Sequence, residues 1–260
     1  MAQDNWIDMQ VNDSTAILTL NRPSQRNALN RAFIAELGAH IAMLSGRRDL
    51  RAVILRGVGN AFAAGADIAE MQSMSPAEAE QFARLGQRIF TALEHLPQPT
   101  IALVHGYALG GGLELAMACD MRIAAEGAQF GQPEVALGVT PGFGGSQRLP
   151  RIVGQGRALQ MILTGERIDA ATALQYGLVQ QVVPADELLE SGLQLAAALA
   201  KRGPLALAYA KRAVYDGAEL DLSKGQALEA SFFGLLFSTQ DQKEGMEAFL
   251  AKRQATFRGE

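Results

Sequence analysis

The sequence predicts an α/β protein with a helical carboxyl-terminal part, and two patterns carry this prediction. Over the first two thirds of the chain, short apolar runs typical of strands alternate with amphipathic helical segments. From about Asp186 onward the strand-type runs stop and helical segments follow one another. Strands first and helices last indicate a core with a helical appendage. We therefore expect one continuous domain, with its core over residues 1–185 and a helical module over residues 186–260.

Five short segments have the character of strands. Ile7–Val11 and Ala16–Leu20 flank a run of turn-forming residues, which predicts a hairpin. Val53–Leu55 and Thr100–Val104 are almost wholly apolar, as strands buried on both faces tend to be. Val179–Val183, where two glutamines interrupt the valines, gives a weaker prediction of a strand.

Two amphipathic helices are predicted within the core. Apolar residues recur near a period of 3.6 over Asn30–Leu44 and Pro76–Leu96. Ser75 and Pro76 suit the cap and the first turn of the second helix. The carboxyl-terminal helices are expected over four segments that open with a cap residue or a proline: Asp186–Arg202, Pro204–Asp216, Asp221–Phe237 and Thr239–Lys252.

Composition and charge indicate an ordinary soluble globular protein. Of the 260 residues, 48% are hydrophobic and 19% charged, and no apolar run approaches the roughly 20 residues of a membrane span. The net charge of -4 provides no field that would attract nucleic acid or an anionic membrane. Cys119 is the single cysteine, and the first residues lack the features of a signal or transit peptide. We expect a cytoplasmic enzyme with neither a membrane nor a nucleic-acid partner.

The commoner catalytic motifs do not occur in the sequence. The glycine-rich stretches Gly106–Gly112 and Gly142–Ser146 do not form a dinucleotide fingerprint, and Gly112 stands where a P-loop requires lysine. There is no Gly-x-Ser-x-Gly elbow of a serine hydrolase. The three histidines lie far apart in the sequence and near no set of cysteine or acidic ligands, so we expect no metal site.

Two glutamates stand out by their surroundings. Glu114 is the only charged residue in Leu109–Cys119, and Glu134 is the only one in Gly127–Gln147. Burial of a carboxylate costs on the order of several kcal/mol and raises its pKa. In a pair of carboxyl groups, this lets one remain a proton donor while the other stays ionised. A catalytic pair is one interpretation, and a helix cap or a buried ion pair at each glutamate is the alternative.

Two loops rich in small residues are candidates for binding negative charge. Gly110–Gly112 follows the predicted strand Thr100–Val104 and precedes an apolar helix that carries Glu114. Free N–H groups at such a helix start favour an anion, which suits an oxyanion hole, whereas a tight turn would need the same glycines. The second loop, Ala61–Ile68, follows the strand Val53–Leu55. Each loop could donate one N–H to the same oxygen, but spacing alone does not show that they converge.

Blocks of residues along essentially the whole chain resemble the crotonase (enoyl-CoA hydratase/isomerase) family in order and spacing. They are Asn21–Asn30, Phe62–Ile68, His105–Asp120, Phe130–Glu134, Pro141–Leu149, Leu163–Ile168 and Thr239–Phe249. The pattern is closest to that of short-chain enoyl-CoA hydratases. The resemblance implies a spiral of ββα units followed by helices that build homotrimers, commonly paired into homohexamers. One carboxyl-terminal helix carries several large apolar residues, which fits such an intersubunit role. They are Phe232, Phe233, Leu235, Leu236 and Phe237.

The resemblance also implies a set of site residues. Glu114 and Glu134 match the catalytic pair, with Glu114 assigned to activating water and Glu134 to delivering a proton to the α-carbon. The backbone N–H groups that hold the thioester oxygen match Ala66 and Gly111. The adenine end of coenzyme A is expected against the loops Arg26–Ala28 and Ala64–Ile68. The residues matched with substrate and coenzyme A binding are Arg26, Ala28, Ala64, Gly65, Ala66, Asp67, Ile68 and Gly111. The resemblance also implies that a basic residue contacts the phosphates of coenzyme A. The candidates are Lys252 and Arg258, of the same or a neighbouring subunit. Coenzyme A is part of the substrate, so no separate cofactor is expected.

The presence of both glutamates favours a hydratase. The expected reaction is the reversible addition of water to a trans-2-enoyl-CoA to give a 3-hydroxyacyl-CoA, as in fatty-acid or related acyl-CoA degradation. Family isomerases often keep only the second glutamate, so a 3,2-enoyl-CoA isomerase or another activity of the family is the alternative. Some relatives bind RNA, and the stretch around Arg47, Arg48 and Arg51 is the candidate face, although such charge runs are usually solvated surface.

Overall fold

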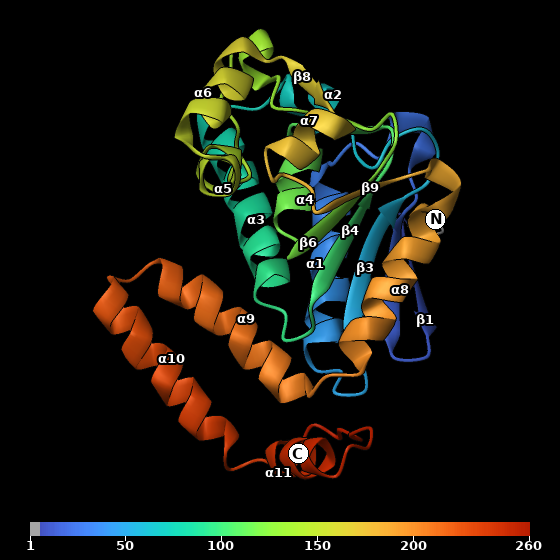
Figure 1. Cartoon of the computed structure of the whole chain (residues 1–260). Helices are drawn as coiled ribbons and strands as arrows, with labels where there is room; N and C mark the ends of the chain where they lie inside the picture. Colours follow the sequence, from blue (N-terminus) through green and yellow to red (C-terminus); the bar gives the residue numbers. More distant parts are fainter. Residues whose placement is uncertain (1–5) are drawn as a thin grey trace.

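The computed structural model describes residues 6–260, in which two β-sheets are surrounded by helices (Figure 1). Within these residues the larger sheet has the strand order β1-β2-β3-β4-β6-β9 and the smaller sheet the order β5-β7-β8. Neighbouring strands run parallel except in the β1–β2 and β7–β8 pairs. The strands are β1 Ile7–Asn12, β2 Thr15–Leu20, β3 Ala52–Gly57, β4 Thr100–Val104, β5 Tyr107–Leu109, β6 Met121–Ala125, β7 Gln129–Gly131, β8 Arg167–Asp169 and β9 Gln181–Val183.

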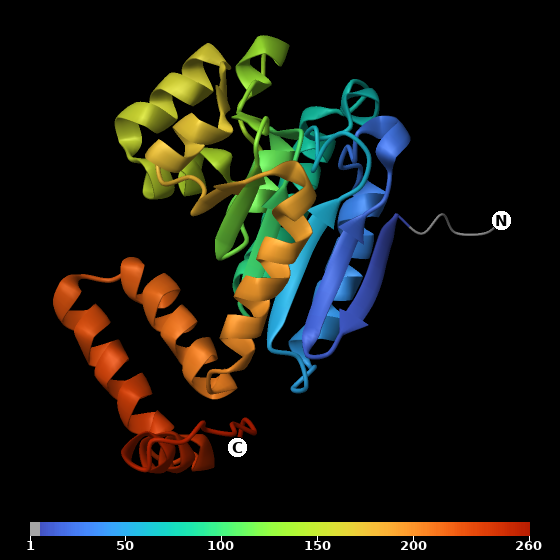
Figure 2. The ribbon, with the colours of Figure 1, turned by 45° about the vertical axis from the view of Figure 1, so that its right-hand side comes forward.

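Helices cover both faces of the larger sheet and continue beyond it (Figures 1 and 2). The α-helices are α1 Arg31–Ser45, α2 Ile68–Met71, α3 Pro76–Glu94, α4 Gly111–Met117, α5 Gly145–Val153, α6 Gln155–Thr164, α7 Ala170–Gln175, α8 Leu188–Ala200, α9 Pro204–Ala218, α10 Leu222–Leu236 and α11 Gln240–Leu250. Three short 3-10 helices are assigned in residues 6–260: η1 Pro23–Gln25, η2 Glu134–Leu137 and η3 Ala185–Glu187. No helix of this part of the chain is long and apolar enough to cross a membrane.

The larger sheet has a hydrophobic core on each face, because successive side chains of a strand point to opposite sides. In β3, Val53 and Leu55 belong to the larger apolar cluster, together with side chains of α1 and α3. Ile54, between them, belongs to a second cluster that includes Leu188 and Ala196 of α8. The prediction of strands buried on both faces is therefore confirmed for β3. Its partner β4 is buried along its whole length.

Local sequence signals account for the ends of the predicted core elements. The hairpin forms as expected, with Asn12 paired to Thr15 at its turn. The Asn30 side chain caps α1, and Ser75 forms a capping box with Glu78 at the start of α3. The weaker strand prediction is confirmed only for the last three residues of that segment, which form β9. The smaller sheet was not predicted, because three-residue strands are too short to show a period.

The carboxyl-terminal helices differ in their relation to the sheets. The helix α8 covers the second face of the larger sheet, while α9 and α10 form a helical hairpin that extends away from it (Figure 2). We call α9 and α10 the arm. The division of the chain at residues 185 and 186 stays a prediction, since α8 is part of the layered core.

A buried polar cluster joins the arm to the core. Asp120, directly before β6, accepts a hydrogen bond from the Tyr215 hydroxyl at 2.9 Å and lies 2.8 Å from the Lys211 ammonium, both on α9. The backbone N–H and the hydroxyl of Thr100 in β4 also donate to this carboxylate, at 2.7 and 3.0 Å. One oxygen of Asp120 has three partners and the other accepts from Tyr215, so the charge is well compensated in its half-buried position.

Candidate active site

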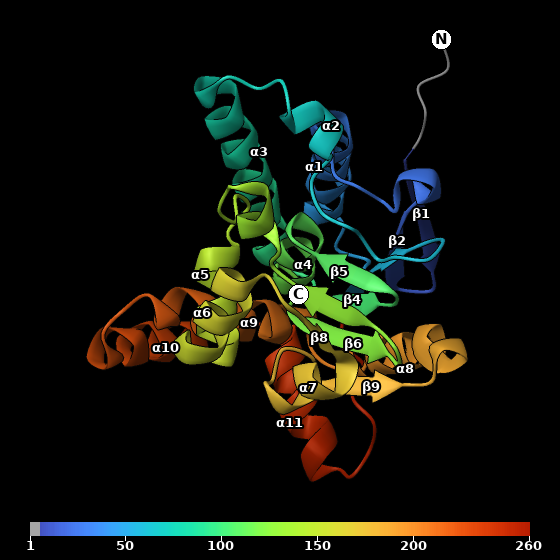
Figure 3. The ribbon, with the colours of Figure 1, turned by 90° about the horizontal axis from the view of Figure 1, so that it is seen from above.

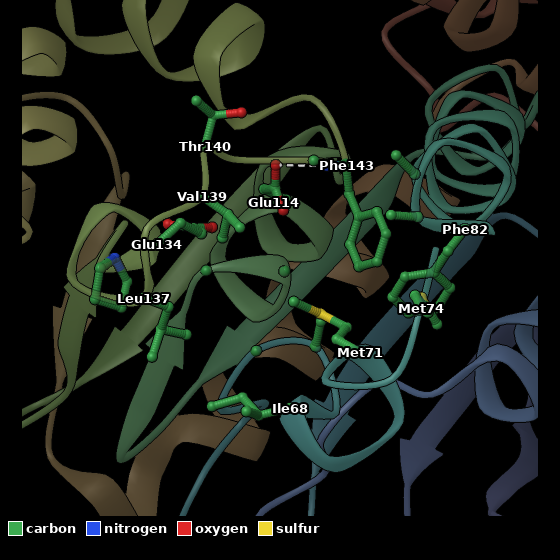
Figure 4. A pocket seen from close by; sticks show the side chains of 18 of the residues that line it. Ile68, Met71, Met74, Phe82, Glu114, Glu134, Leu137, Val139, Thr140 and Phe143 are labelled. Atoms are coloured by element: carbon green, nitrogen blue, oxygen red, sulfur yellow. Dashed lines mark hydrogen bonds between the residues drawn. The ribbon is translucent and has the colours of Figure 1, made fainter. Parts of the chain in front are cut away.

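A cavity of about 460 Å³ lies between the loop after β3, the start of α4, the 3-10 helix η2 and the helix α3 (Figure 4). Seen from above, α4 has α2 and α3 on one side and α5 to α7 on another (Figure 3). Met71, Met74 and Phe82 form an apolar part of the wall, and Glu114 and Glu134 contribute carboxyl groups. The cavity thus combines a large apolar surface with a few polar groups, as small-molecule sites usually do.

The two small-residue loops converge at this cavity. Gly110, with φ 49°, precedes α4, and the position of Gly111 as the first helical residue leaves its N–H without an intrahelical acceptor. A Cβ built on Gly111 would lie 3.4 Å from the Ala66 nitrogen, so the two residues are adjacent. Within residues 6–260, neither of their N–H groups donates a hydrogen bond to the backbone. Both are therefore available to an acceptor in the cavity.

Backbone contacts fix the loop Ala61–Ile68 against the segment that precedes α1. The Leu29 N–H donates to the Gly65 carbonyl at 2.8 Å, and the Asp67 N–H donates to the Leu29 carbonyl at 3.0 Å. The N–H of Ala64 donates to the carbonyl of Arg26 at 3.0 Å. The predicted substrate-binding residues of the two segments thus lie side by side: Arg26, Ala28, Ala64, Gly65, Ala66, Asp67 and Ile68.

An ion pair and a buried amide stabilise this arrangement. Arg22 lies 2.8 Å from the Asp67 carboxylate and also donates to the Ala28 carbonyl. Asn27 is fully buried and its side-chain nitrogen donates to the carbonyl groups of Ala61 and Phe62 at 2.9 and 3.1 Å. The arginine ion pair lowers the pKa of Asp67, so this carboxylate stays ionised at neutral pH.

Glu114 is almost completely buried at 1% exposure, on the first turn of α4. Its Oε1 accepts hydrogen bonds from the N–H groups of Phe143 at 2.8 Å and Gly145 at 2.6 Å. We call residues 142–145 the donor loop. Burial raises the pKa of Glu114 to about 8; the Gly145 N–H opposes this rise and the charge of Glu134 adds to it. The group can therefore exchange a proton near neutral pH.

Glu134 is the first residue of η2, and it is half-buried in the wall of the same cavity. Burial raises its pKa to about 7. Gln132, which is fully buried, lies beside it, and with its amide nitrogen toward the carboxylate it donates to both oxygens at 2.7 and 3.0 Å. Figure 4 shows Glu114 and Glu134 close to each other along the cavity wall. The interpretation of each glutamate as a helix cap or half of a buried ion pair has no support in these contacts.

The Phe143 ring forms part of the cavity wall and fixes the donor loop against α3. Its centroid lies 5.1 Å from that of Phe82 and 5.6 Å from that of Phe90, both edge-to-face. A Cβ on Gly86 of α3 would meet this ring at 2.3 Å, so only glycine permits the packing.

Sequence reasoning missed the roles of Gln132 and the donor loop. The signals were present in the blocks Phe130–Glu134 and Pro141–Leu149.

The structure does not bring the two basic candidates to the cavity of the same chain. Lys252 and Arg258 follow α11, which lies at the opposite end of the molecule from α2 and α4 (Figure 1). The backbone N–H of Arg258 donates to Asp241 at 2.7 Å, which holds the terminal segment near α11. No group of three or more histidine, cysteine or acidic side chains that could hold a metal ion occurs in residues 6–260.

Comparison with known proteins identifies the family. The family model described as enoyl-CoA hydratase/isomerase matches residues 10–260. The chain belongs to the enoyl-CoA hydratase/isomerase family. A crotonyl-CoA hydratase of Syntrophomonas wolfei is 47% identical over 99% of both chains. A short-chain-enoyl-CoA hydratase of Clostridium acetobutylicum is 45% identical over 96% of both.

Solved structures of this family have the same fold as the chain. An enoyl-CoA hydratase from Bacillus anthracis superimposes with a TM-score of 0.95 at 40% identity, covering 98% of this chain and 100% of that one. An enoyl-CoA hydratase from Geobacillus kaustophilus gives a TM-score of 0.94 at 42% identity, covering 98% of each chain. The predicted α/β fold of ββα units with carboxyl-terminal helices is confirmed.

The buried Glu114 predicts a specific dependence of stability on pH. The folded state keeps a proton on this carboxyl up to about pH 8, whereas an unfolded chain releases it near pH 4.5. Stability therefore falls as pH rises through this window. Glu114→Gln removes the buried charge and keeps an acceptor for the donor loop. We expect the variant to be more stable than the parent at pH 8.5, by on the order of a few kcal/mol, with the gap closing toward pH 5.

Urea unfolding at fixed protein concentration checks this expectation at both pH values. The matched control is Glu80→Gln, the same change at an exposed position of α3. A variant of Glu114 that is less stable than the parent at pH 8.5 would contradict the argument.

Proposed function

We propose that the protein is an enoyl-CoA hydratase, which adds water reversibly across a trans-2-enoyl-CoA to give a 3-hydroxyacyl-CoA. The observation that carries the proposal is one cavity with two carboxyl groups, Glu114 and Glu134, and two free backbone N–H groups, from Ala66 and Gly111. The named activities of the relatives from Syntrophomonas wolfei and Clostridium acetobutylicum support it and favour a short acyl chain.

The chemistry requires that electrons move toward the thioester oxygen while water adds at the β-carbon. The N–H groups of Ala66 and Gly111 donate to this oxygen and stabilise the enolate that forms there. Such donors act strongly because they are fixed in advance and lie in a cavity of low polarity. The apolar wall around Met71 and Phe82 accommodates the acyl chain.

The two carboxyl groups divide the proton transfers. Following the family resemblance, Glu114 takes a proton from water as its oxygen bonds to the β-carbon, and Glu134 gives a proton to the α-carbon. The pKa values of about 8 and about 7 leave about one proton on the pair near neutral pH, and hydration proceeds from the state in which this proton lies on Glu134 and Glu114 is ionised. The two N–H donors on Glu114 stabilise its ionised form.

A direct assay tests the proposal. Purified protein should convert crotonyl-CoA to 3-hydroxybutyryl-CoA, followed by loss of the enoyl absorbance and by incorporation of oxygen from labelled water. A 3-enoyl-CoA of the same length is the comparison substrate. Migration of the double bond without uptake of water, together with no hydration of crotonyl-CoA, would favour the isomerase alternative. A series of 2-enoyl-CoAs of increasing length then defines the acyl preference.

We further propose that the protein works as a homotrimer or homohexamer and needs no cofactor besides the coenzyme A of its substrate. Large apolar side chains exposed on the arm and on α11 support the assembly, among them Phe233 at 65% and Phe249 at 82% exposure. Light scattering that shows a monomer at micromolar concentration would contradict it. The reduced, buried Cys119 is consistent with our expectation of a cytoplasmic location. The absence of a nucleic-acid partner stays a prediction.

A further inference from the structure

The helix α3 holds one end of the donor loop through a side chain outside the cavity. Gln87 of α3 donates to the carbonyl oxygen of Gly142 at 2.8 Å. The next residue of the loop, Phe143, packs its ring on the same helix and directs its N–H to Glu114. The position of this N–H donor is therefore determined by α3 as well as by the loop itself.

An ion pair between α5 and α3 holds the other end of the loop. Arg148 of α5 lies 2.5 Å from the carboxylate of Glu94 at the end of α3, and the two side chains are only 14% and 16% exposed. The guanidinium also donates to the Phe143 carbonyl and to the Thr91 hydroxyl, each at 3.3 Å. A Cβ on Gly144, where φ is 110°, would meet the guanidinium at 2.5 Å. The arginine thus lies directly against the donor loop.

We propose that Arg148 and Glu94 are positioning residues for Glu114, because their ion pair fixes the donor loop and controls the charge near the catalytic carboxyl. This inference rests on the proposed hydratase function. The charged groups that act on Glu114 are Glu134 of η2 and Arg148 of α5, with Glu94 behind the arginine. Burial raises the pKa of Glu114, and the positive charge of Arg148 opposes that rise.

The two halves of the pair should shift the pH profile in opposite directions. Arg148→Met removes the positive charge and frees the loop, so the limb of the kcat/KM profile that requires ionised Glu114 should move to higher pH. We expect kcat at pH 7 to fall by about 10–100-fold with KM changed by less than about threefold. Glu94→Gln leaves the arginine charge uncompensated, so the same limb should move to lower pH, with a smaller loss of kcat.

Two further variants separate charge from geometry. Arg148→Lys keeps the positive charge but cannot contact Glu94 and the Phe143 carbonyl with one rigid fork. It should restore the pH limb to near its parental position while recovering only part of kcat. The control is the exposed pair Arg84–Glu80 on α3, with N and O atoms 2.7 Å apart and side chains 70% and 62% exposed. Replacing it with Met and Gln should leave both readouts unchanged.

The experiment measures pH profiles with crotonyl-CoA and, separately, titrates the Glu114 carboxyl by infrared difference spectroscopy, with Glu114→Gln as the blank. A parent protein that does not hydrate crotonyl-CoA refutes the proposed function, whereas the infrared midpoint still reports the effect of Arg148. Opposite shifts for Arg148→Met and Glu94→Gln support the inference. Midpoints unchanged in both variants, or a loss of kcat without a shift, would overturn it. If Arg148→Met does not fold, Arg148→Lys and Glu94→Gln carry the test.

Discussion

Glu114→Gln should lower kcat for crotonyl-CoA hydration by about 10²–10⁴-fold, and Glu134→Gln should have an effect of similar size. Glutamine keeps the size and the hydrogen-bonding capacity of the side chain but does not exchange a proton at neutral pH. Both residues line the cavity, and Glu114 keeps its two backbone donors in the variant, so the loss reflects chemistry more than packing. Affinity for the coenzyme A ester should change little, because the loops that we expect to hold the nucleotide, Arg26–Ala28 and Ala64–Ile68, contain neither glutamate.

The double variant and isotope exchange test whether the two carboxyl groups cooperate. Residues that act as one unit are not additive, so the double variant should lose far less than the product of the single effects. Glu134→Gln should suppress deuterium exchange at the α-carbon more than Glu114→Gln does, if Glu134 is the proton donor. Either single variant that folds and hydrates crotonyl-CoA at close to the parental rate would contradict the two-carboxylate mechanism.

Gly111→Pro should lower kcat by about 10²–10³-fold, the usual loss for one oxyanion-hole donor. Proline has no N–H, and the first position of a helix tolerates its fixed φ, so the change at the start of α4 is compatible with folding. It also adds a Cβ, which would lie 2.9 Å from the Phe143 ring. Gly111→Ala adds the same carbon and keeps the donor, so it is the matched control.

Steady-state kinetics of the two variants separates the two effects. A large loss in Gly111→Pro with a much smaller loss in Gly111→Ala supports the donor role. Equal losses would assign the effect to the contact with Phe143 instead, and a folded proline variant with near-parental turnover would rule out Gly111 as a donor.

The parts of the fold that sequence could predict are those with a local signal. The cap at Ser75, the period of α3 and the apolar run of β4 each depend on neighbours in the chain. The smaller sheet depends on pairing between short strands that are distant in sequence, such as β7 with β8. Its residues carry no period, so the sheet becomes visible only in the structure.

The features of the site also differ in whether a local sequence signal reveals them. Isolation among uncharged neighbours was enough to select Glu114 and Glu134 from the sequence. Burial raises the pKa of both, and the contacts that oppose the rise at Glu114 come from elsewhere in the chain: Phe143 is 29 residues from Glu114, and Arg148 reaches Glu94 across 54 residues. Spacing does not reveal such contacts, because they depend on how α3, α4 and α5 are placed around the cavity.

The anchor of the arm at Asp120 has a consequence for the homo-oligomer that we propose. Its contacts with Tyr215 and Lys211 hold α9 against the core within a single chain. A surface that is already rigid loses little conformational entropy when it docks, so a larger share of its contact energy remains as affinity. Weakening the anchor should therefore loosen the association between copies even though Asp120 lies outside the exposed apolar surface of the arm.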